Sequence, residues 1–171
     1  MEFAYEAFSI KSLLNTSCSI TQGQLEGRNI AFVTDFSQIS NEYVVGSELH
    51  IRQILLNILG NAVKYTIHGQ IQFIVNEISA DETNARYRFI IKDTGIGMSE
   101  EFLEHIFDAF AQENNNGART KYIGTGLGMS IVKRMVDEMN GTIKVESVLD
   151  VGSTFTIELE FPIAMKEQLQ E

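Results

Sequence analysis

The sequence predicts a single α/β (α+β) domain, a two-layer sandwich in which a mixed β-sheet packs on about three helices. Apolar residues recur at helical spacing in three long segments, and strand-like alternation occupies the segments between and after them. This order of helices and strands is typical of a layered architecture. With 171 residues, no internal repeat and no interdomain linker, the chain is expected to form one domain over residues 1–171.

The first half of the chain predicts two helices with a strand between them. Apolar spacing from Phe8 to Leu25 indicates a helix with Ser9 at its N-cap, and residues 29–35 indicate a strand. A second helix is expected from Glu48 to about Tyr65. Its buried stripe comprises Ile51, Ile54, Leu55, Ile58 and Ala62.

The second half predicts a short helix near residues 99–107 and a longer one from about Gly126 to Met139, ended by Gly141 as a left-handed cap. Residues 111–123 are polar and rich in asparagine, which predicts a mobile loop. Four strands complete the sheet, the last two as an antiparallel hairpin, at residues 70–78, 85–92, 142–147 and 153–161.

The composition excludes several classes of function. A formal net charge of −10 opposes binding along a nucleic-acid backbone, so no nucleic-acid partner is expected. No segment is long and apolar enough to span a membrane, and the acidic N-terminus does not resemble a signal peptide. A single cysteine, Cys18, suits a reducing compartment, so we expect a cytoplasmic domain. Such an acidic protein can bind an anionic nucleotide only through local donors.

Three polar side chains line one face of the second helix. Asn57, Asn61 and Lys64 are spaced at i, i+4 and i+7, on the side away from the apolar stripe. For these three side chains taken alone, a solvated helix edge is the more common explanation. Asparagine is a poor helix former, however, and two on one line favour a functional reason.

Two glycine-rich segments follow strand and loop regions. Residues 93–98 (DTGIGM) place Asp93 at the end of a strand, where a buried carboxylate needs a partner such as a purine amine. Residues 124–129 (GTGLGM) lead directly into a helix, where backbone N–H groups can bind phosphate. The G-x-G-x-G spacing fits neither the dinucleotide-binding fingerprint nor the P-loop. Either segment alone is also compatible with an ordinary turn.

The order of these features resembles the N, first-glycine, F and second-glycine boxes of sensor histidine kinases. The matching segments are residues 51–66 (IRQILLNILGNAVKYT), 93–98, 106–112 (IFDAFAQ), 124–136 (GTGLGMSIVKRMV) and the pair VES and GSTF at 145–147 and 152–155. The resemblance covers essentially the whole chain. It implies the Bergerat ATP-binding (GHKL) fold, which is shared with gyrase, mismatch-repair and heat-shock chaperone ATPases.

The resemblance also implies roles for individual residues in binding ATP and Mg²⁺. Asp93 would accept the adenine amine, with Tyr65 stacking on the ring, Gly97 packing beneath it and Thr154 near it through water. Asn61 would coordinate Mg²⁺, supported by Asn57. Phe107 and Phe110 would anchor a lid at about 111–123, although both are equally well explained as core residues. The full implied ATP-binding set is Asn57, Asn61, Lys64, Tyr65, Asp93, Gly95, Gly97, Met98, Phe110, Arg119, Lys121, Gly124, Thr125, Gly126, Leu127, Gly128 and Thr154.

Three functions are compatible with this fold: a protein-histidine kinase, a hydrolysing ATPase, and a non-catalytic nucleotide-gated binding module. Hydrolysing relatives carry a glutamate four residues before the shared asparagine as general base, and here that position is Asn57. An amide cannot accept the proton, so transfer to a nucleophile supplied elsewhere is favoured.

The phosphate acceptor of such a kinase is not expected in this chain. His50, His68 and His105 lack the sequence context of an acceptor histidine, and surface or helix-end positions explain all three. The resemblance implies that the acceptor lies on a separate dimerisation hairpin, with a response regulator downstream. The domain alone is then expected to be monomeric and unable to autophosphorylate. A hybrid or membrane-anchored parent kinase is compatible with this interpretation.

Overall fold

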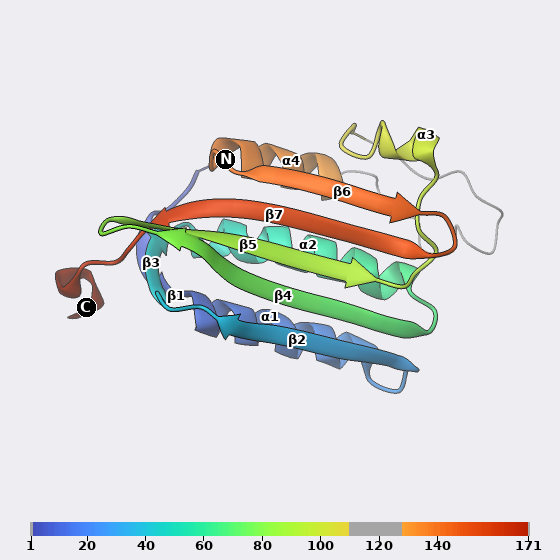
Figure 1. Cartoon of the computed structure of the whole chain (residues 1–171), viewed down its shortest axis with the longest axis horizontal. Coiled ribbons are helices and arrows are strands. Elements are labelled where there is room, and N and C mark those ends of the chain that lie inside the picture. Colours follow the sequence, from blue (N-terminus) through green and yellow to red (C-terminus); the bar gives the residue numbers. More distant parts are fainter. Residues whose placement is uncertain (1, 110–127, 171) are drawn as a thin grey trace.

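A computed structural model describes residues 2–109 and 128–170 and contains a five-stranded mixed sheet (Figure 1). Neighbouring strands follow the order β2-β4-β5-β7-β6. The first pair is parallel and the other three pairs are antiparallel. The strand bounds are β2 Ile30–Gln38, β4 Gly69–Ala80, β5 Asn84–Asp93, β6 Thr142–Val148 and β7 Gly152–Pro162.

Three helices cover one face of this sheet: α1 (Ile10–Leu25), α2 (Glu48–Tyr65) and α4 (Gly128–Glu138) (Figure 1). The predicted two-layer α/β sandwich is therefore confirmed. Alternate residues of β4, β5 and β7 point into the core between the layers, and helix α2 buries a wider stripe than expected, including Leu59 and Val63. None of the helices within residues 2–109 and 128–170 has both the length and the apolarity to cross a membrane.

A second, two-stranded sheet was not predicted. Strands β1 (Glu6–Ser9) and β3 (Tyr43–Gly46) pair antiparallel, and β3 also meets the chain after β7 through a bridge between Val44 and Ile163. Each strand has four residues, which is too short for alternation to be recognised in the sequence. The ribbon takes Phe8 out of the predicted first helix, which begins at Ile10.

The helix boundaries agree with the prediction at the N-cap of α1 and differ from it at α3. Ser9 is the N-cap of α1, as expected, because its hydroxyl accepts a hydrogen bond from the Ser12 N–H at 3.1 Å. The helix expected at residues 99–107 is much shorter: α3 spans Glu100–Leu103, and turns follow it. The chain ends in a 3₁₀ turn, η2 (Lys166–Gln170). The expected start of α4 at Gly126 lies outside the described residues.

Gly141 does not form the left-handed cap that the sequence predicts. The left-handed residue is Asn140, with φ of 57°. The N–H groups of Asn140 and Gly141 donate to the carbonyls of Asp137 and Val136, which is the Schellman arrangement. Gly141 is required for a different reason: a Cβ there would lie 2.4 Å from Leu159 Cδ2 and 2.6 Å from the Glu158 carbonyl oxygen.

This correction predicts different costs for two neighbouring substitutions. Gly141→Ala should lower the free energy of unfolding by about 1–3 kcal/mol, because the new methyl group overpacks the contact with β7. Asn140→Gly should change it by less than about 0.5 kcal/mol, because glycine adopts a positive φ readily. Urea titration of both variants measures the difference. Equal costs, or a larger cost for Asn140→Gly, would contradict the packing explanation.

Candidate functional site

The predicted polar face of α2 is present and has no partner within the described chain. Asn57 and Asn61 are half-buried, and Lys64 is exposed. Among residues 2–109 and 128–170, no hydrogen bond or ion pair engages these three side chains. Helix α2 also packs against α4, whose N-terminus at Gly128 lies toward the same end of the sheet as the C-terminus of α2 (Figure 1). The amides and the ammonium are therefore without a hydrogen-bond or ion-pair partner in the described part of the chain.

Asp93 ends strand β5 as a buried carboxylate. Its exposed fraction is 6%, and it is the one carboxyl side chain in the buried set of the described residues. The Gly95 N–H donates to Asp93 Oδ1 at 2.8 Å, and the Ser153 N–H also donates to the carboxylate. Burial raises the pKa of Asp93, and these two donors partly oppose the shift. The buried carboxylate thus keeps acceptor capacity beyond its two backbone donors.

Backbone hydrogen bonds fix the loop that follows Asp93 to the end of α2 and the start of β4. The Ile96 N–H donates to the Tyr65 carbonyl at 3.0 Å. The Thr94 N–H donates to the Gln70 carbonyl at 3.1 Å, and the Gln70 N–H returns a bond to Thr94 Oγ1 at 3.0 Å. These contacts join the predicted asparagine helix to the predicted first glycine segment.

The same loop is bound on its other side by the β6–β7 hairpin. The Asp150 N–H donates to the Ile96 carbonyl at 2.6 Å, and the Met98 N–H donates to Ser147 Oγ at 2.8 Å. Ser147 Oγ also lies 2.8 Å from Ser153 Oγ. The hairpin therefore holds both the loop and the residue that donates to Asp93.

The two glycines of the loop, Gly95 and Gly97, are required for different structural reasons. A Cβ on Gly95 would lie 2.5 Å from the Tyr65 carbonyl oxygen and 2.8 Å from Asp93 Oδ1, so any side chain would intrude beside the carboxylate. Gly97 has φ of 66°, and a Cβ there would lie 2.1 Å from the Val148 carbonyl oxygen. Gly97 thus permits the close approach of the β6–β7 hairpin, a role that the sequence did not reveal.

Thr154 does not lie with the rest of the predicted set. It pairs in register with Lys92, whereas Ser153 pairs with Asp93. Successive residues of a strand point to opposite faces, so Thr154 lies on the sheet face away from the helices and Ser153 lies on the face of Asp93. The sequence did not identify Ser153 and Ser147 as site residues. The alternation of side chains along the strand that contains GSTF would have placed Ser153, and not Thr154, on the same face of the sheet as Asp93.

Three aromatic or apolar side chains near the site are only partly exposed. Tyr65 is half-buried, and burial raises the pKa of its phenol. Met98 and Phe107 are partly buried and pack against the core, so core packing accounts for the position of Phe107. Gly128 opens α4. The remaining predicted residues lie outside the described part of the chain: Phe110, Arg119, Lys121, Gly124, Thr125, Gly126 and Leu127, with the predicted lid at 111–123.

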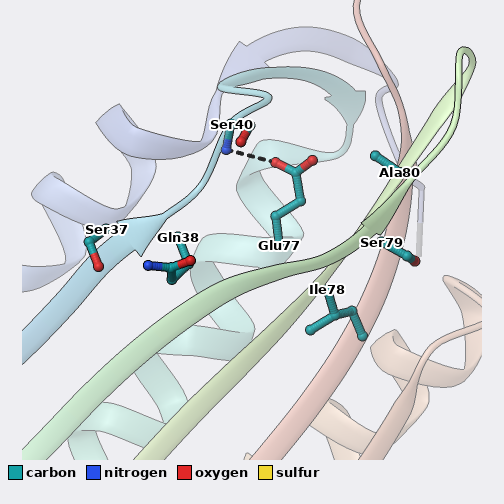
Figure 2. Close-up of a pocket in the computed structure, with 7 residues that line it drawn as sticks. All are labelled: Ser37, Gln38, Ser40, Glu77, Ile78, Ser79 and Ala80. Atoms are coloured by element: carbon teal, nitrogen blue, oxygen red, sulfur yellow. Dashed lines mark hydrogen bonds between the residues drawn. The ribbon is translucent and has the colours of Figure 1, made fainter.

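A hollow of about 320 Å³ lies at the opposite end of the sheet (Figure 2). Its lining comes from the end of β2, the following loop and the end of β4, and includes Glu77. The Glu77 carboxylate accepts hydrogen bonds from the backbone N–H groups of Ser40 and Asn41, at 2.9 and 2.7 Å, and from the Asn41 side chain. These contacts explain Glu77 as the anchor of the loop before β3, separate from the Asp93 site.

Comparison with known proteins identifies a family that matches this geometry. A family model described as "Histidine kinase-, DNA gyrase B-, and HSP90-like ATPase" matches residues 46–163. Hybrid signal transduction histidine kinase B of Dictyostelium discoideum is 38% identical over 156 residues, which cover 91% of this chain. The chain spans only 8% of that relative's length.

Two solved structures share the fold. Full-length ShkA, crystallised in complex with AMPPNP, is similar with a TM-score of 0.78 and 30% identity, over 96% of this chain and 32% of ShkA. The nucleotide-free catalytic domain of the histidine kinase ThkA has a TM-score of 0.74 and 27% identity, over 95% of this chain and 97% of that domain. The chain therefore belongs to the family of histidine kinase-, DNA gyrase B- and HSP90-like ATPases, and within it is the ATP-binding catalytic domain of a sensor histidine kinase.

Proposed function

We propose that this domain binds Mg-ATP between α2 and the loop after β5, and donates the γ-phosphate to a histidine on a separate dimerisation hairpin in two-component signal transduction. The observation that carries the proposal is the chemistry of the α2 face. It presents two amides, Asn57 and Asn61, that no described residue engages, and it has no carboxylate at the position where hydrolysing relatives carry their general base. Such a face can hold a triphosphate without activating water.

The adenine is proposed to bind at Asp93. A buried carboxylate that already accepts two backbone N–H groups keeps lone pairs for a further donor, and the adenine amine is such a donor. Glycine at position 95 lets the loop backbone approach Asp93 Oδ1 closely, since a Cβ there would lie 2.8 Å from that oxygen, and the carboxylate thereby keeps the geometry proposed for the adenine contact. Tyr65 is proposed to stack on the adenine, and Ser153 takes the neighbouring polar position that the sequence had assigned to Thr154.

The triphosphate is proposed to lie along the exposed side of α2. Lys64 supplies a positive charge there, and the N-terminal end of α4, whose first described residue is Gly128, is proposed to supply backbone donors. Asn61, supported by Asn57, is proposed as a ligand of Mg²⁺, which favours oxygen ligands and neutralises charge on the phosphates when bound. Lys121 or Arg119 is proposed to contact the phosphates, and Gly124 and Gly126 are proposed to wrap them, as the resemblance implies.

The acceptor histidine is proposed to belong to another domain. His50 lies 11 positions before Asn61 on α2, about 16 Å along the helix, and its Nδ1 lies 2.6 Å from Ser47 Oγ. His105 Nδ1 lies 2.9 Å from Asp108 Oδ2. These two histidines have local structural partners, as their sequence context predicts. We accordingly propose a monomeric domain that acts on the dimerisation hairpin of its parent kinase on the cytoplasmic side, with a response regulator as the next phosphate acceptor.

The proposal is tested by mixing this chain with labelled ATP, Mg²⁺ and a cognate dimerisation hairpin supplied as a second protein. We expect acid-labile phosphohistidine on the hairpin, and no label on this chain when the hairpin is omitted. A hairpin whose histidine is replaced by alanine is the matched control. Nucleotide binding without transfer would instead support a binding module, and steady phosphate release that is lost in Asn57→Ala would support a hydrolysing ATPase.

Removal of the Asp93 carboxylate should weaken nucleotide binding strongly. Loss of a hydrogen bond to a charged group predicts that Asp93→Ala raises the dissociation constant of ATP about 10- to 150-fold. Isothermal titration with ATP and with GTP measures the effect. Thr154→Ala is the control, because Thr154 lies on the opposite face of the sheet. A change of less than about threefold in Asp93→Ala would remove Asp93 from the proposed adenine site.

The raised pKa of Asp93 gives the same interaction a pH dependence. The ionised carboxylate is the stronger acceptor, so ATP affinity should be full above the raised pKa and should fall as the pH drops through it, before an ordinary aspartate would titrate. The stability of the free domain changes in the opposite sense, because the neutral carboxyl is favoured by burial: the contribution of Asp93 is present at low pH and is lost as the pH rises through the raised pKa. Dividing the ATP affinity of the wild type by that of Asp93→Asn at each pH cancels the effect of the nucleotide's own titration. A ratio that stays constant across this range would contradict the assignment of Asp93 to the adenine site.

A further inference from the structure

We infer that Arg28 is a positioning residue for the nucleotide site, an inference that rests on the proposed function of that site. Arg28 lies in the turn between α1 and β2, and its Nη2 donates to the Thr66 carbonyl oxygen at 2.6 Å. Thr66 is the C-cap of α2 and is fully buried. Arg28 therefore bonds the last carbonyl of the helix that carries Asn57, Asn61 and Tyr65.

The hydrogen bond from Arg28 satisfies the Thr66 carbonyl, which would otherwise be unpaired in the interior. Thr66 already has a buried hydroxyl without a hydrogen-bond partner among the described residues. Its carbonyl lies at the negative end of the α2 dipole, where an arginine is a favourable partner. Within residues 2–109 and 128–170 Arg28 forms no ion pair, so the carbonyl is the partner that orients its guanidinium.

Asn29, the residue after Arg28, is bonded to the chain just beyond Thr66. The Gly69 N–H donates to the Asn29 carbonyl at 3.3 Å, and Gly69 pairs with Ile30 in the parallel ladder of β2 and β4. Gly69 has φ of 116°, and a Cβ there would lie 2.1 Å from Thr94 Oγ1. The turn at residues 27–29 thus fixes residues 66–69 from the side opposite to the loop after β5.

The loop after β5 binds the two ends of this same segment. The Ile96 N–H donates to Tyr65, directly before Thr66, and the Thr94 N–H donates to Gln70, directly after Gly69. Residues 66–69 are therefore held between Arg28 on one side and the Asp93 loop on the other. A shift of Thr66 would move the Tyr65 carbonyl, the Ile96 N–H and, with them, the backbone donor of Gly95 to Asp93.

Two substitutions at Arg28 separate positioning from general stability. Arg28→Met keeps an unbranched apolar stem but removes the donor and the charge, and Arg28→Lys keeps a cation at the helix terminus. We expect Arg28→Met to raise the dissociation constant of Mg-ATP roughly threefold to tenfold, and Arg28→Lys to recover most of that loss. The amide resonances of Gly95 and Ile96 should shift in nucleotide-free Arg28→Met.

The matched control is Arg88→Met. Arg88 pairs with Glu158 at 2.9 Å on the outer face of the sheet, and its loss should leave ATP affinity and both amide resonances unchanged. Equal weakening in both variants, in step with their melting temperatures, would overturn the positioning role. So would unchanged affinity in Arg28→Met together with unchanged resonances. Failure of the wild-type domain to bind Mg-ATP would refute the proposed function alone, because the Gly95 and Ile96 resonances still test the link from Arg28 to the loop.

Discussion

The arrangement of this domain depends on one buried carboxylate and on the backbone groups that make its burial tolerable. Asp93 is 6% exposed and has no cationic partner among its hydrogen-bond donors. An unpaired charge in that position would be strongly destabilising, so the N–H groups of Gly95 and Ser153 must be held in place. One belongs to the loop after β5 and the other to β7, and every contact described around the site fixes one of these two segments.

Helix α2 links this constraint to the core. One side of the helix buries seven apolar residues against the sheet and the neighbouring helices, so its position is set by packing. The other side carries the amides of Asn57 and Asn61, which therefore occupy fixed positions and engage no partner among residues 2–109 and 128–170. At its C-terminus the carbonyl groups of Tyr65 and Thr66 accept bonds from the Asp93 loop and from Arg28. Helix α2 thus stabilises the fold and orients the proposed phosphate site. It also fixes the position of the loop that carries the proposed adenine site.

The fold and most of the site could be predicted because they depend on periodic or ordered signals. The apolar stripe of α2, the alternation in β5 and the position of Asp93 at a strand end all follow from local spacing, and the family resemblance arranged them in one site. The alternation of side chains along a strand distinguishes Ser153 from Thr154, because it places them on opposite faces of the sheet. The roles of Gly97 and Gly141 could not be predicted, because each depends on a backbone or side chain brought close by the fold, at Val148 and Leu159. Arg28 was missed for the same reason, since its partner is 38 residues away.

The hydrogen bonds around Asp93 fix the loop after β5 in one geometry before nucleotide arrives. Amide hydrogen exchange of the nucleotide-free domain tests it most directly, because the N–H groups of Gly95, Ile96 and Met98 are bonded to Asp93, Tyr65 and Ser147 respectively. We expect these three amides to exchange slowly, with protection approaching that of the central strand β5, and to gain little protection on addition of Mg-ATP. Exchange as fast as in an exposed loop, with protection appearing only when nucleotide is bound, would contradict it.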